Sequence, residues 1–343
     1  MRYFALMTNL QQRINAFAAL GNRLENLDQE EFLNWVAYAS AQNKWFTESS
    51  IRQAIANIRK LLIKDLLTDW CASYNFVGKT PMRVGMVLAG NIPLVGFHDI
   101  LSVLISGNIA VIKVSSQDAV LIQKVLGLLI EAEPKMSVQI EIAEKITLAD
   151  AYIATGSDNT ARYFEYYFSK KPNIIRKNRT SVAVLNGNEQ EQDIHMLGED
   201  MFTYFGLGCR NVSKLFLPVG FDPVNLIKHL EKYSYLIDHT KYGNNYEYNR
   251  AIYLLKGMPY FDNGFILLKE DEGLVSPISV IFYSFYNNKT ELQNYLQENK
   301  EKIQVVASMD GWFEGSLPFG AAQKPSLTDY ADNVDTMAFL ERL

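Results

Sequence analysis

Residues 84–116 read VGMVLAGNIPLVGFHDILSVLISGNIAVIKVSS, and this stretch decides the fold class. Its first apolar run, residues 84–88, has the length of a strand and ends at a Gly-Asn-Ile-Pro turn (90–93). A helical pattern follows and stops at Gly107-Asn108, which is typical of a helix C-terminus, and residues 109–114 form a second apolar run. Strand, helix and strand at this spacing predict a βαβ unit in a parallel sheet.

The same alternation extends on both sides of this stretch. Apolar residues recur every three or four positions within 9–70, which predicts helices there. The basic stretch SKKPNIIRKNR (169–179) is interpreted as the seam before a second α/β unit, which begins at Ser181. Further helices are expected at 119–130, 194–205, 224–233 and 289–299, and further strands at 150–154, 181–185, 214–217, 278–285 and 303–307.

Composition excludes several functional classes. The 343 residues are 48% hydrophobic and carry a net charge of −5, so a nucleic-acid partner is not expected. No apolar run reaches the roughly 20 residues that span a bilayer, so no stable membrane insertion is expected. The beginning, MRYFALMTNLQQR, lacks the features of a secretory signal, and two cysteines are too few for a disulfide framework. We therefore expect a cytoplasmic protein.

The histidines have no metal-ligand spacing among themselves or with the cysteines, so no metal site is expected. Cys71 ends an apolar helical pattern and is interpreted as a buried structural thiol. Cys209 lies instead in Phe-Gly-Leu-Gly-Cys-Arg-Asn (205–211). Glycines before a cysteine permit close approach of a substrate and leave a backbone N–H facing the reacting oxygen. Cys209 is therefore a candidate nucleophile, although a structural thiol fits this local pattern as well.

Four motifs in order resemble those of the aldehyde dehydrogenase superfamily. They are the Asn-Ile-Pro turn with the following Lys-x-Ser (91–115), Thr155-Gly-Ser157, Gly208-Cys209 and Pro318-Phe-Gly320. Within the superfamily the chain is most similar to the LuxC-type acyl-CoA reductases, especially over PFGAAQKPSLTDYADNVDTMAFL (318–340). The resemblance implies an α/β fold with a helical N-terminal region and a Rossmann-like nicotinamide-binding domain (1–180). It also implies a catalytic domain (181–312) and a tail (313–343) that packs on the cofactor domain or on an oligomer partner.

The resemblance also implies catalytic roles. Cys209 would attack the acyl-CoA carbonyl and carry the acyl group as a thioester, while the side chain of Asn91 would donate to the oxyanion. A local alternative for Asn91 is a turn residue that caps nearby backbone. Hydrolytic relatives have a general-base Glu upstream of the cysteine, but no carboxylate occurs between Lys170 and Asn188. The thioester would therefore escape hydrolysis and be reduced to the aldehyde.

The cofactor residues implied by the resemblance are Lys113, Ser115, Ser116, Thr155, Gly156, Ser157 and Glu272. Relatives that prefer NAD often have a Glu where Ser116 stands. Because a carboxylate there would repel a 2′-phosphate, NADPH is the expected cofactor, with NADH possible. Lys113 fits a solvated strand end as well, and residues 155–157 fit a plain turn. Glu272 is one position away from the family's Glu. The basic side chains of Arg176, Lys177 and Arg179 fit either phosphate binding or a solvated seam.

The predicted activity is therefore that of an NADPH-dependent acyl-CoA reductase that forms a fatty aldehyde. Three alternatives remain open: a CoA-acylating aldehyde dehydrogenase that acts on short-chain aldehydes, an acyl-thioester carrier or acyltransferase without redox chemistry, and a catalytically silent scaffold. The expected partners are acyl-CoA or an acyl-donor protein, an acyl-protein synthetase that delivers the acyl group, and further copies of the chain in a homo-oligomer.

Overall fold

A computed structural model describes residues 7–146 and 148–343, and the chain divides into two compact units. Unit 1 comprises the chain up to Asn178 together with Ser326–Leu343, and unit 2 comprises Arg179–Pro325. The segment 313–343, which the sequence analysis treats as one tail, is therefore divided: its first part belongs to unit 2 and its last part to unit 1. No described helix has both the length and the apolar character needed to cross a bilayer.

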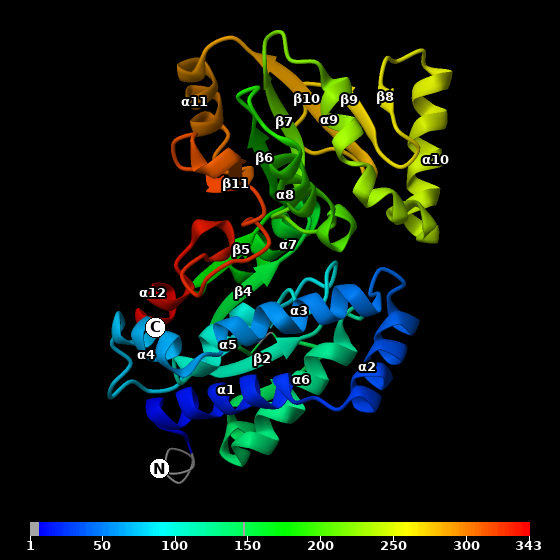
Figure 1. Ribbon diagram of the computed structural model, residues 1–343. Coiled ribbons are helices and arrows are strands. Elements are labelled where there is room, and N and C mark those ends of the chain that lie inside the picture. Colours follow the sequence, from blue (N-terminus) through cyan, green and yellow to red (C-terminus); the bar gives the residue numbers. More distant parts are fainter. Residues whose placement is uncertain (1–6, 147) are drawn as a thin grey trace. The chain divides into compact units, whose positions relative to one another are not determined.

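The centre of unit 1 is a parallel sheet, of which Figure 1 labels β2, β4 and β5. It has five strands in the order β3-β2-β1-β4-β5. Its strands are β1 (Arg83–Val87), β2 (Ile109–Lys113), β3 (Ile140–Ile142), β4 (Ala151–Thr155) and β5 (Asn173–Arg176). β1 pairs with β2 on one side and with β4 on the other. The parallel βαβ unit predicted from residues 84–116 is confirmed, because α5 (Phe97–Ile105) connects β1 to β2.

Helices pack around this sheet through their apolar faces. Several of them begin at a polar residue that caps the first turn. The side chains of Asn9, Asp28 and Thr47 accept hydrogen bonds from the first turns of α1, α2 and α3. α1 packs on α6, and α12 packs on α5. The remaining bounds are α1 (Leu10–Glu25), α2 (Gln29–Gln42), α3 (Glu48–Leu61), α4 (Lys64–Ala72), α6 (Ala119–Ala132), η2 (Pro134–Gln139), α7 (Asp158–Phe168), η6 (Ala331–Asn333) and α12 (Thr336–Glu341).

The basic stretch 169–179, interpreted as the seam between two α/β units, contains β5, an edge strand paired with β4, and unit 2 begins at its last residue, Arg179. Arg176 in β5 is 4% exposed and forms an ion pair with Asp99 of α5. Its second nitrogen donates to the hydroxyl of Thr336 in α12, at 3.0 Å. Arg176 thus holds the C-terminal helix against the sheet, and neither a solvated role nor phosphate binding applies to it.

Unit 2 has a seven-stranded sheet in the order β12-β11-β6-β7-β10-β9-β8, antiparallel only between β8 and β9. Its strands are β6 (Thr180–Val184), β7 (Val212–Pro218), β8 (Phe261–Asp262), β9 (Leu267–Glu270), β10 (Val280–Tyr286), β11 (Ile303–Ser308) and β12 (Leu317–Pro318). Its helices are α8 (Glu191–Phe202), η3 (Thr203–Gly206), α9 (Pro223–His229), η4 (Glu231–Asp238), α10 (Thr240–Leu255), α11 (Lys289–Glu298) and η5 (Met309–Gly311). Leu292 and Leu296 of α11 pack on Val182, Val184 and Phe216 in the core.

Candidate active site

The carboxyl ends of β1, β2 and β4 bring the predicted cofactor residues of unit 1 to one edge of the sheet. In the strand register, Val87 at the end of β1 lies opposite both Lys113 and Ala154. Asn91 follows β1, Ser115 follows β2 and Thr155 ends β4. The chain order reverses between β1 and β4, and ligands of open α/β sheets bind at such a reversal, outside the carboxyl ends of the strands.

The turn after β1 places Asn91 on the surface of this edge. Asn91 is exposed, while Gly90 before it and Leu94 after it are buried. Leu94 has φ 59°, a left-handed conformation that is costly for a residue with a branched side chain. Its backbone N–H donates to Oδ2 of Asp118 at 2.8 Å. A polar contact from outside the turn therefore holds it in an unfavourable backbone conformation.

The loop after β2 lies directly against this turn. A Cβ added to Gly90 would lie 2.4 Å from Oγ of Ser115, so only glycine lets the turn after β1 lie this close to the loop after β2. Oγ of Ser115 accepts a hydrogen bond from the N–H of Gln117, which gives Ser115 a role within the loop itself. Lys113 and Ser116 are exposed. Of the candidates on this loop, these two therefore have the side chains most open to a ligand.

The Thr155-Gly156-Ser157 turn is occupied by local hydrogen bonds. The N–H of Gly156 donates to the carbonyl of Arg176, continuing the β4–β5 pairing. Oγ of Ser157 accepts from the N–H of Thr160 and caps α7. The backbone N–H of Gly156 is therefore already used within the sheet and is not available to a phosphate. The hydroxyl of the half-buried Thr155 is left as the polar side-chain group at the end of β4.

In unit 2, a strained loop carries Cys209 to the start of β7. Tyr204 and Phe205, in η3, have φ 54° and 60°, and Gly206 has φ 78°. Consecutive left-handed residues other than glycine cost roughly 1–3 kcal/mol each and concentrate at functional sites. The carbonyl of Cys209 accepts a hydrogen bond from Oγ of Ser181 at 3.0 Å, and the thiol side chain is partly exposed.

Asn211 holds this loop together, although sequence reasoning gave it no role. Its buried side-chain nitrogen donates to the carbonyls of Asp200, Met201 and Thr203, and its oxygen accepts from the N–H of Gly208 at 2.7 Å. The Asn211 amide therefore joins the end of α8 to the residue just before the cysteine. Its place two residues after Cys209, within the quoted motif, was the available signal.

Asp200 links the Pro-Phe-Gly segment to the same loop. The carboxylate is fully buried and accepts hydrogen bonds from the N–H groups of Gly320 and Ala322, at 2.7 and 3.0 Å. Burial raises the pKa of this carboxyl to about 7, while the two N–H groups act in the opposite direction. Arg210, next to Cys209, donates to the carbonyl of Ala322. The fold thereby brings the Pro318-Phe-Gly320 motif beside the loop of Cys209.

Glu272 lies in the exposed segment that follows β9. Two residues later, the carbonyl of Leu274 accepts a hydrogen bond from Oγ of Ser213 at 2.7 Å. Ser213 is the second residue of β7, which begins shortly after Cys209. The structure thus places the Glu272 segment near the start of β7, and a cofactor role for its carboxylate stays a prediction.

Cys71 contrasts with Cys209. It is 1% exposed, and burial raises the pKa of its thiol to about 11, which keeps it protonated. The interpretation of Cys71 as a buried structural thiol therefore agrees with the structure. Within residues 7–146 and 148–343, no group of three or more His, Cys, Asp or Glu side chains is arranged to hold a metal ion.

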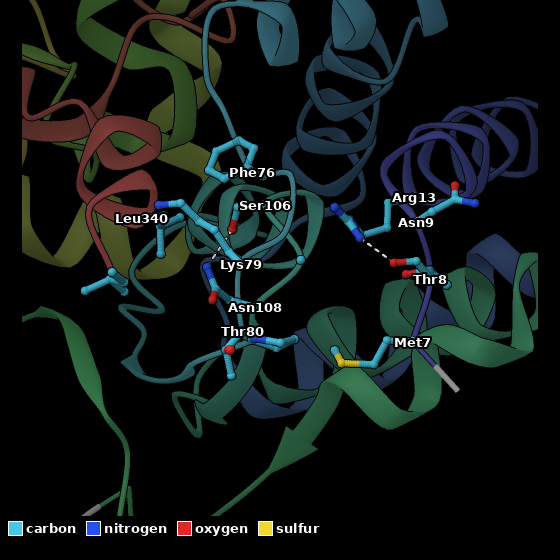
Figure 2. Close-up of a pocket in the computed structure, with 13 residues that line it drawn as sticks. Met7, Thr8, Asn9, Arg13, Phe76, Lys79, Thr80, Ser106, Asn108 and Leu340 are labelled. Carbon is cyan, nitrogen blue, oxygen red and sulfur yellow. Dashed lines mark hydrogen bonds between the residues drawn. The ribbon is translucent and has the colours of Figure 1, made fainter. Parts of the chain in front are cut away.

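A polar pocket of about 260 Å³ in unit 1 lies at the other edge of the sheet (Figure 2). Its lining includes Pro81 and Asn108, which precede β1 and β2, and Arg13 of α1. Arg13 donates hydrogen bonds to the carbonyls of Ile105 and Thr8. The pocket is thus formed at the amino ends of the strands and is separate from the edge that carries Asn91.

Comparison with known proteins shows the family and the fold. The family model of acyl-CoA reductase (LuxC) matches residues 39–226, more than half of the chain. An aldehyde dehydrogenase of Mycobacterium tuberculosis complexed with NAD⁺ is 14% identical with a TM-score of 0.65, over 88% of this chain and 73% of that one. A NAD-dependent benzaldehyde dehydrogenase of Corynebacterium glutamicum is 13% identical with a TM-score of 0.66, over 90% and 78%. No curated protein matches the chain.

At these identities the solved structures establish the fold, and the family model establishes the family. The range matched by the family model contains both Asn91 and Cys209. The turn of Asn91 is fixed by a hydrogen bond to Asp118, and the loop of Cys209 is fixed by a hydrogen bond to Asn211. The chain therefore has the aldehyde dehydrogenase fold and belongs to the LuxC family of acyl-CoA reductases.

Proposed function

We propose that this protein reduces an acyl-CoA to the aldehyde through a thioester on Cys209, with NADPH as the hydride donor. The observation that carries the proposal is the loop of Cys209. Two left-handed residues precede it, and the buried amide of Asn211 holds it by four hydrogen bonds. A purely structural thiol does not need such a strained loop or a partly exposed side chain.

The first step is acyl transfer. The thiolate of Cys209 attacks the carbonyl carbon of acyl-CoA, a new C–S bond forms, and the C–S bond to CoA breaks with departure of the CoA thiolate. The carbonyl oxygen gains negative charge during attack, and the backbone N–H of Cys209 and the side-chain amide of Asn91 would donate to it. A neutral amide suits this role because it stabilises an oxyanion without changing its own charge.

The second step is reduction of the thioester. The residues at the carboxyl edge of unit 1 would hold NADPH, which would supply a hydride to the carbonyl carbon of the Cys209 thioester and become NADP⁺. The resulting thiohemiacetal oxyanion collapses to the aldehyde and expels the Cys209 thiolate, so the enzyme returns to its starting state. One proton is taken up overall, by the CoA thiolate. The same two donors serve the oxyanion in both steps, since the acyl carbon stays attached to Cys209.

The lack of an Asp or Glu in the region where hydrolytic relatives carry their general base supports reduction over hydrolysis. No Asp or Glu occurs between Lys170 and Asn188, the region that contains β5 and β6. Without a carboxylate to activate water, a thioester persists long enough to receive the hydride.

The residues at the carboxyl edge of unit 1 fit a nicotinamide dinucleotide. The reversal between β1 and β4, the close approach at Gly90 and the exposed side chains of Lys113 and Ser116 provide the features that such a ligand needs. The neighbouring carboxyl of Asp118 is buried and accepts a hydrogen bond from the N–H of Leu94. Residues 113–118 therefore present no exposed carboxylate to a ribose. This supports NADPH over NADH, whereas the solved M. tuberculosis relative contains NAD⁺.

The proposed acyl donor is acyl-CoA or an acylated donor protein. Two variants are compared with the wild type to test the proposal: Cys209→Ala, and Cys71→Ala as the matched thiol control. Wild type and Cys71→Ala are expected to oxidise NADPH at 340 nm and release CoA from a long-chain acyl-CoA, while Cys209→Ala does neither. Acylation of Cys209 without NADPH oxidation would establish an acyl carrier instead. Turnover restricted to short-chain substrates would establish a CoA-acylating aldehyde dehydrogenase.

A further inference from the structure

Asp118 stands at the N-cap of α6, yet its side chain does not cap this helix. Asp is among the best N-cap residues because its carboxylate accepts hydrogen bonds from the first turn. Asp28, Asp222 and Asp335 do so at the starts of α2, α9 and α12. Asp118 is 2% exposed and instead directs its carboxylate to the turn after β1.

The carboxylate of Asp118 accepts a hydrogen bond from one backbone N–H group. Oδ2 accepts from the N–H of Leu94 at 2.8 Å, while Oδ1 is buried and has no hydrogen-bond partner among the described residues. Burial raises the pKa of this carboxyl well above its usual range. A desolvated carboxyl with an unsatisfied oxygen destabilises the fold, so the contact with Leu94 is maintained against a considerable cost.

The group that Asp118 holds belongs to the turn that carries Asn91. Leu94 is three residues after Asn91 and has the left-handed φ of 59°. On the other side of Asn91, the carbonyl of Gly90 accepts a hydrogen bond from the side chain of Asn43, which is buried after α2. Asn91 itself is exposed. The short turn is therefore fixed at both ends, and the only exposed residue between the two fixed points is Asn91.

We propose that Asp118 is a positioning residue, which holds the Asn-Ile-Pro-Leu turn and thereby fixes the orientation of the side-chain amide of Asn91, the proposed oxyanion donor. This inference rests on the proposed function of Asn91 and extends it to a residue that does not touch the substrate. Loss of the Leu94 contact relaxes the turn and moves the amide of Asn91. The first chemical step then slows, although the fold persists.

The substitution Asp118→Ser separates this role from stability. A serine hydroxyl is shorter and does not reach the N–H of Leu94, but serine is an excellent N-cap and satisfies the start of α6. Asp118→Asn retains an oxygen that accepts from Leu94 and serves as the conservative rescue. Asp28→Ala is the matched control, because it removes an N-cap carboxylate of the same unit far along the chain from Asn91.

The measurement is the single-turnover rate of CoA release from acyl-CoA without NADPH, together with the melting temperature of each variant. Removal of one oxyanion donor slows such reactions by roughly 100-fold to 1,000-fold, so Asn91→Ala is expected in this range. Asp118→Ser is expected to slow CoA release by about 10-fold or more with a melting temperature near that of wild type. Asp118→Asn should stay close to wild type, and Asp28→Ala should melt earlier without slowing CoA release.

A double variant gives the decisive comparison. If Asp118 acts through Asn91, adding Asp118→Ser to Asn91→Ala causes little further slowing, because the amide that it positions is gone. Multiplication of the two effects would show that Asp118 acts independently of Asn91 and would overturn the proposal. Wild-type rates in Asp118→Ser would overturn it as well. Failure of the wild type to release CoA would instead refute the proposed function itself.

Discussion

Asp200 is a buried carboxyl whose ionisation couples stability to pH. Burial raises its pKa to about 7 in the folded chain, whereas an unfolded aspartate has a pKa of about 3.9. The folded state therefore binds a proton that the unfolded state has released, and the stabilisation from this group is lost as pH rises from about 4 to about 7. Its contribution to the free energy of unfolding falls by at most about 1.4 kcal/mol per pH unit in this window.

Asp200→Asn should remove this dependence while retaining one oxygen for the N–H groups of Gly320 and Ala322. Urea unfolding between pH 4 and 7 measures it as the difference in free energy of unfolding between wild type and variant. We expect wild type to lose stability relative to the variant as pH rises. A difference that stays constant with pH would show that the carboxyl ionises in the folded chain as it does in water.

The proposed preference for NADPH can be tested at Ser116. Ser116→Glu introduces a carboxylate at an exposed position, where it would bind a ribose diol and repel a 2′-phosphate. We expect the ratio of kcat/KM for NADPH to that for NADH to fall by about 10-fold or more. Gln117→Glu adds the same charge one residue further on and serves as the control. An equal effect of both substitutions would indicate general charge repulsion instead of a contact at residue 116.

The residues proposed to touch ligands were easier to find in the sequence than the residues that hold them in place. Asn91 and Cys209 stand in short motifs that contain glycine or proline, and Lys113 stands in the Lys-x-Ser motif. Asp118 and Asp200 act over long sequence separations, on Leu94 and on Gly320. Nothing adjacent to either aspartate in the sequence indicates these partners, so their roles emerge only from the folded chain.

At the scale of elements, the Arg176–Asp99 ion pair joins β5 to α5 and, through Thr336, to α12. Both charges are almost fully buried. Removing one partner of such a pair leaves an uncompensated buried charge and costs about 3–5 kcal/mol. We predict this loss for Arg176→Met, measured by urea unfolding, and a smaller loss for Arg176→Met combined with Asp99→Leu. A double variant that is less stable than either single variant would contradict this account.

Most helices and strands were predictable, and the missed ones have physical reasons. β5 lies in a basic stretch, and its arginine is compensated by an aspartate from another element, which no local pattern reveals. α10 was missed because its buried face consists of Tyr242, Tyr246, Asn249 and Tyr253. These residues recur at helical spacing. Because Tyr and Asn carry polar groups, a pattern based on apolar residues alone does not show this spacing. The helix expected over 194–205 ends at Phe202, where the strained loop of Cys209 begins.

At the scale of the whole molecule, unit 1 is built from two distant parts of the chain. Tyr330 accepts a hydrogen bond from Nε1 of Trp70 at 2.8 Å, and the hydroxyl of Tyr74 donates to Asp335 at 2.9 Å. These contacts attach the C-terminal segment to α4 and to the turn that follows it. The sequence indicated a tail that packs back, but not where it leaves unit 2, because the boundary after Pro325 depends on contacts that are remote in sequence.

The central claim is that one thiol carries the acyl group between the two chemical steps. The most direct test is the intact mass of the protein after incubation with acyl-CoA, followed by addition of NADPH, with peptide mapping of any adduct. We predict one acyl group per chain on Cys209, released as aldehyde when NADPH is added, and no adduct in Cys209→Ala. An adduct on another residue, or aldehyde formation by Cys209→Ala, would contradict the account.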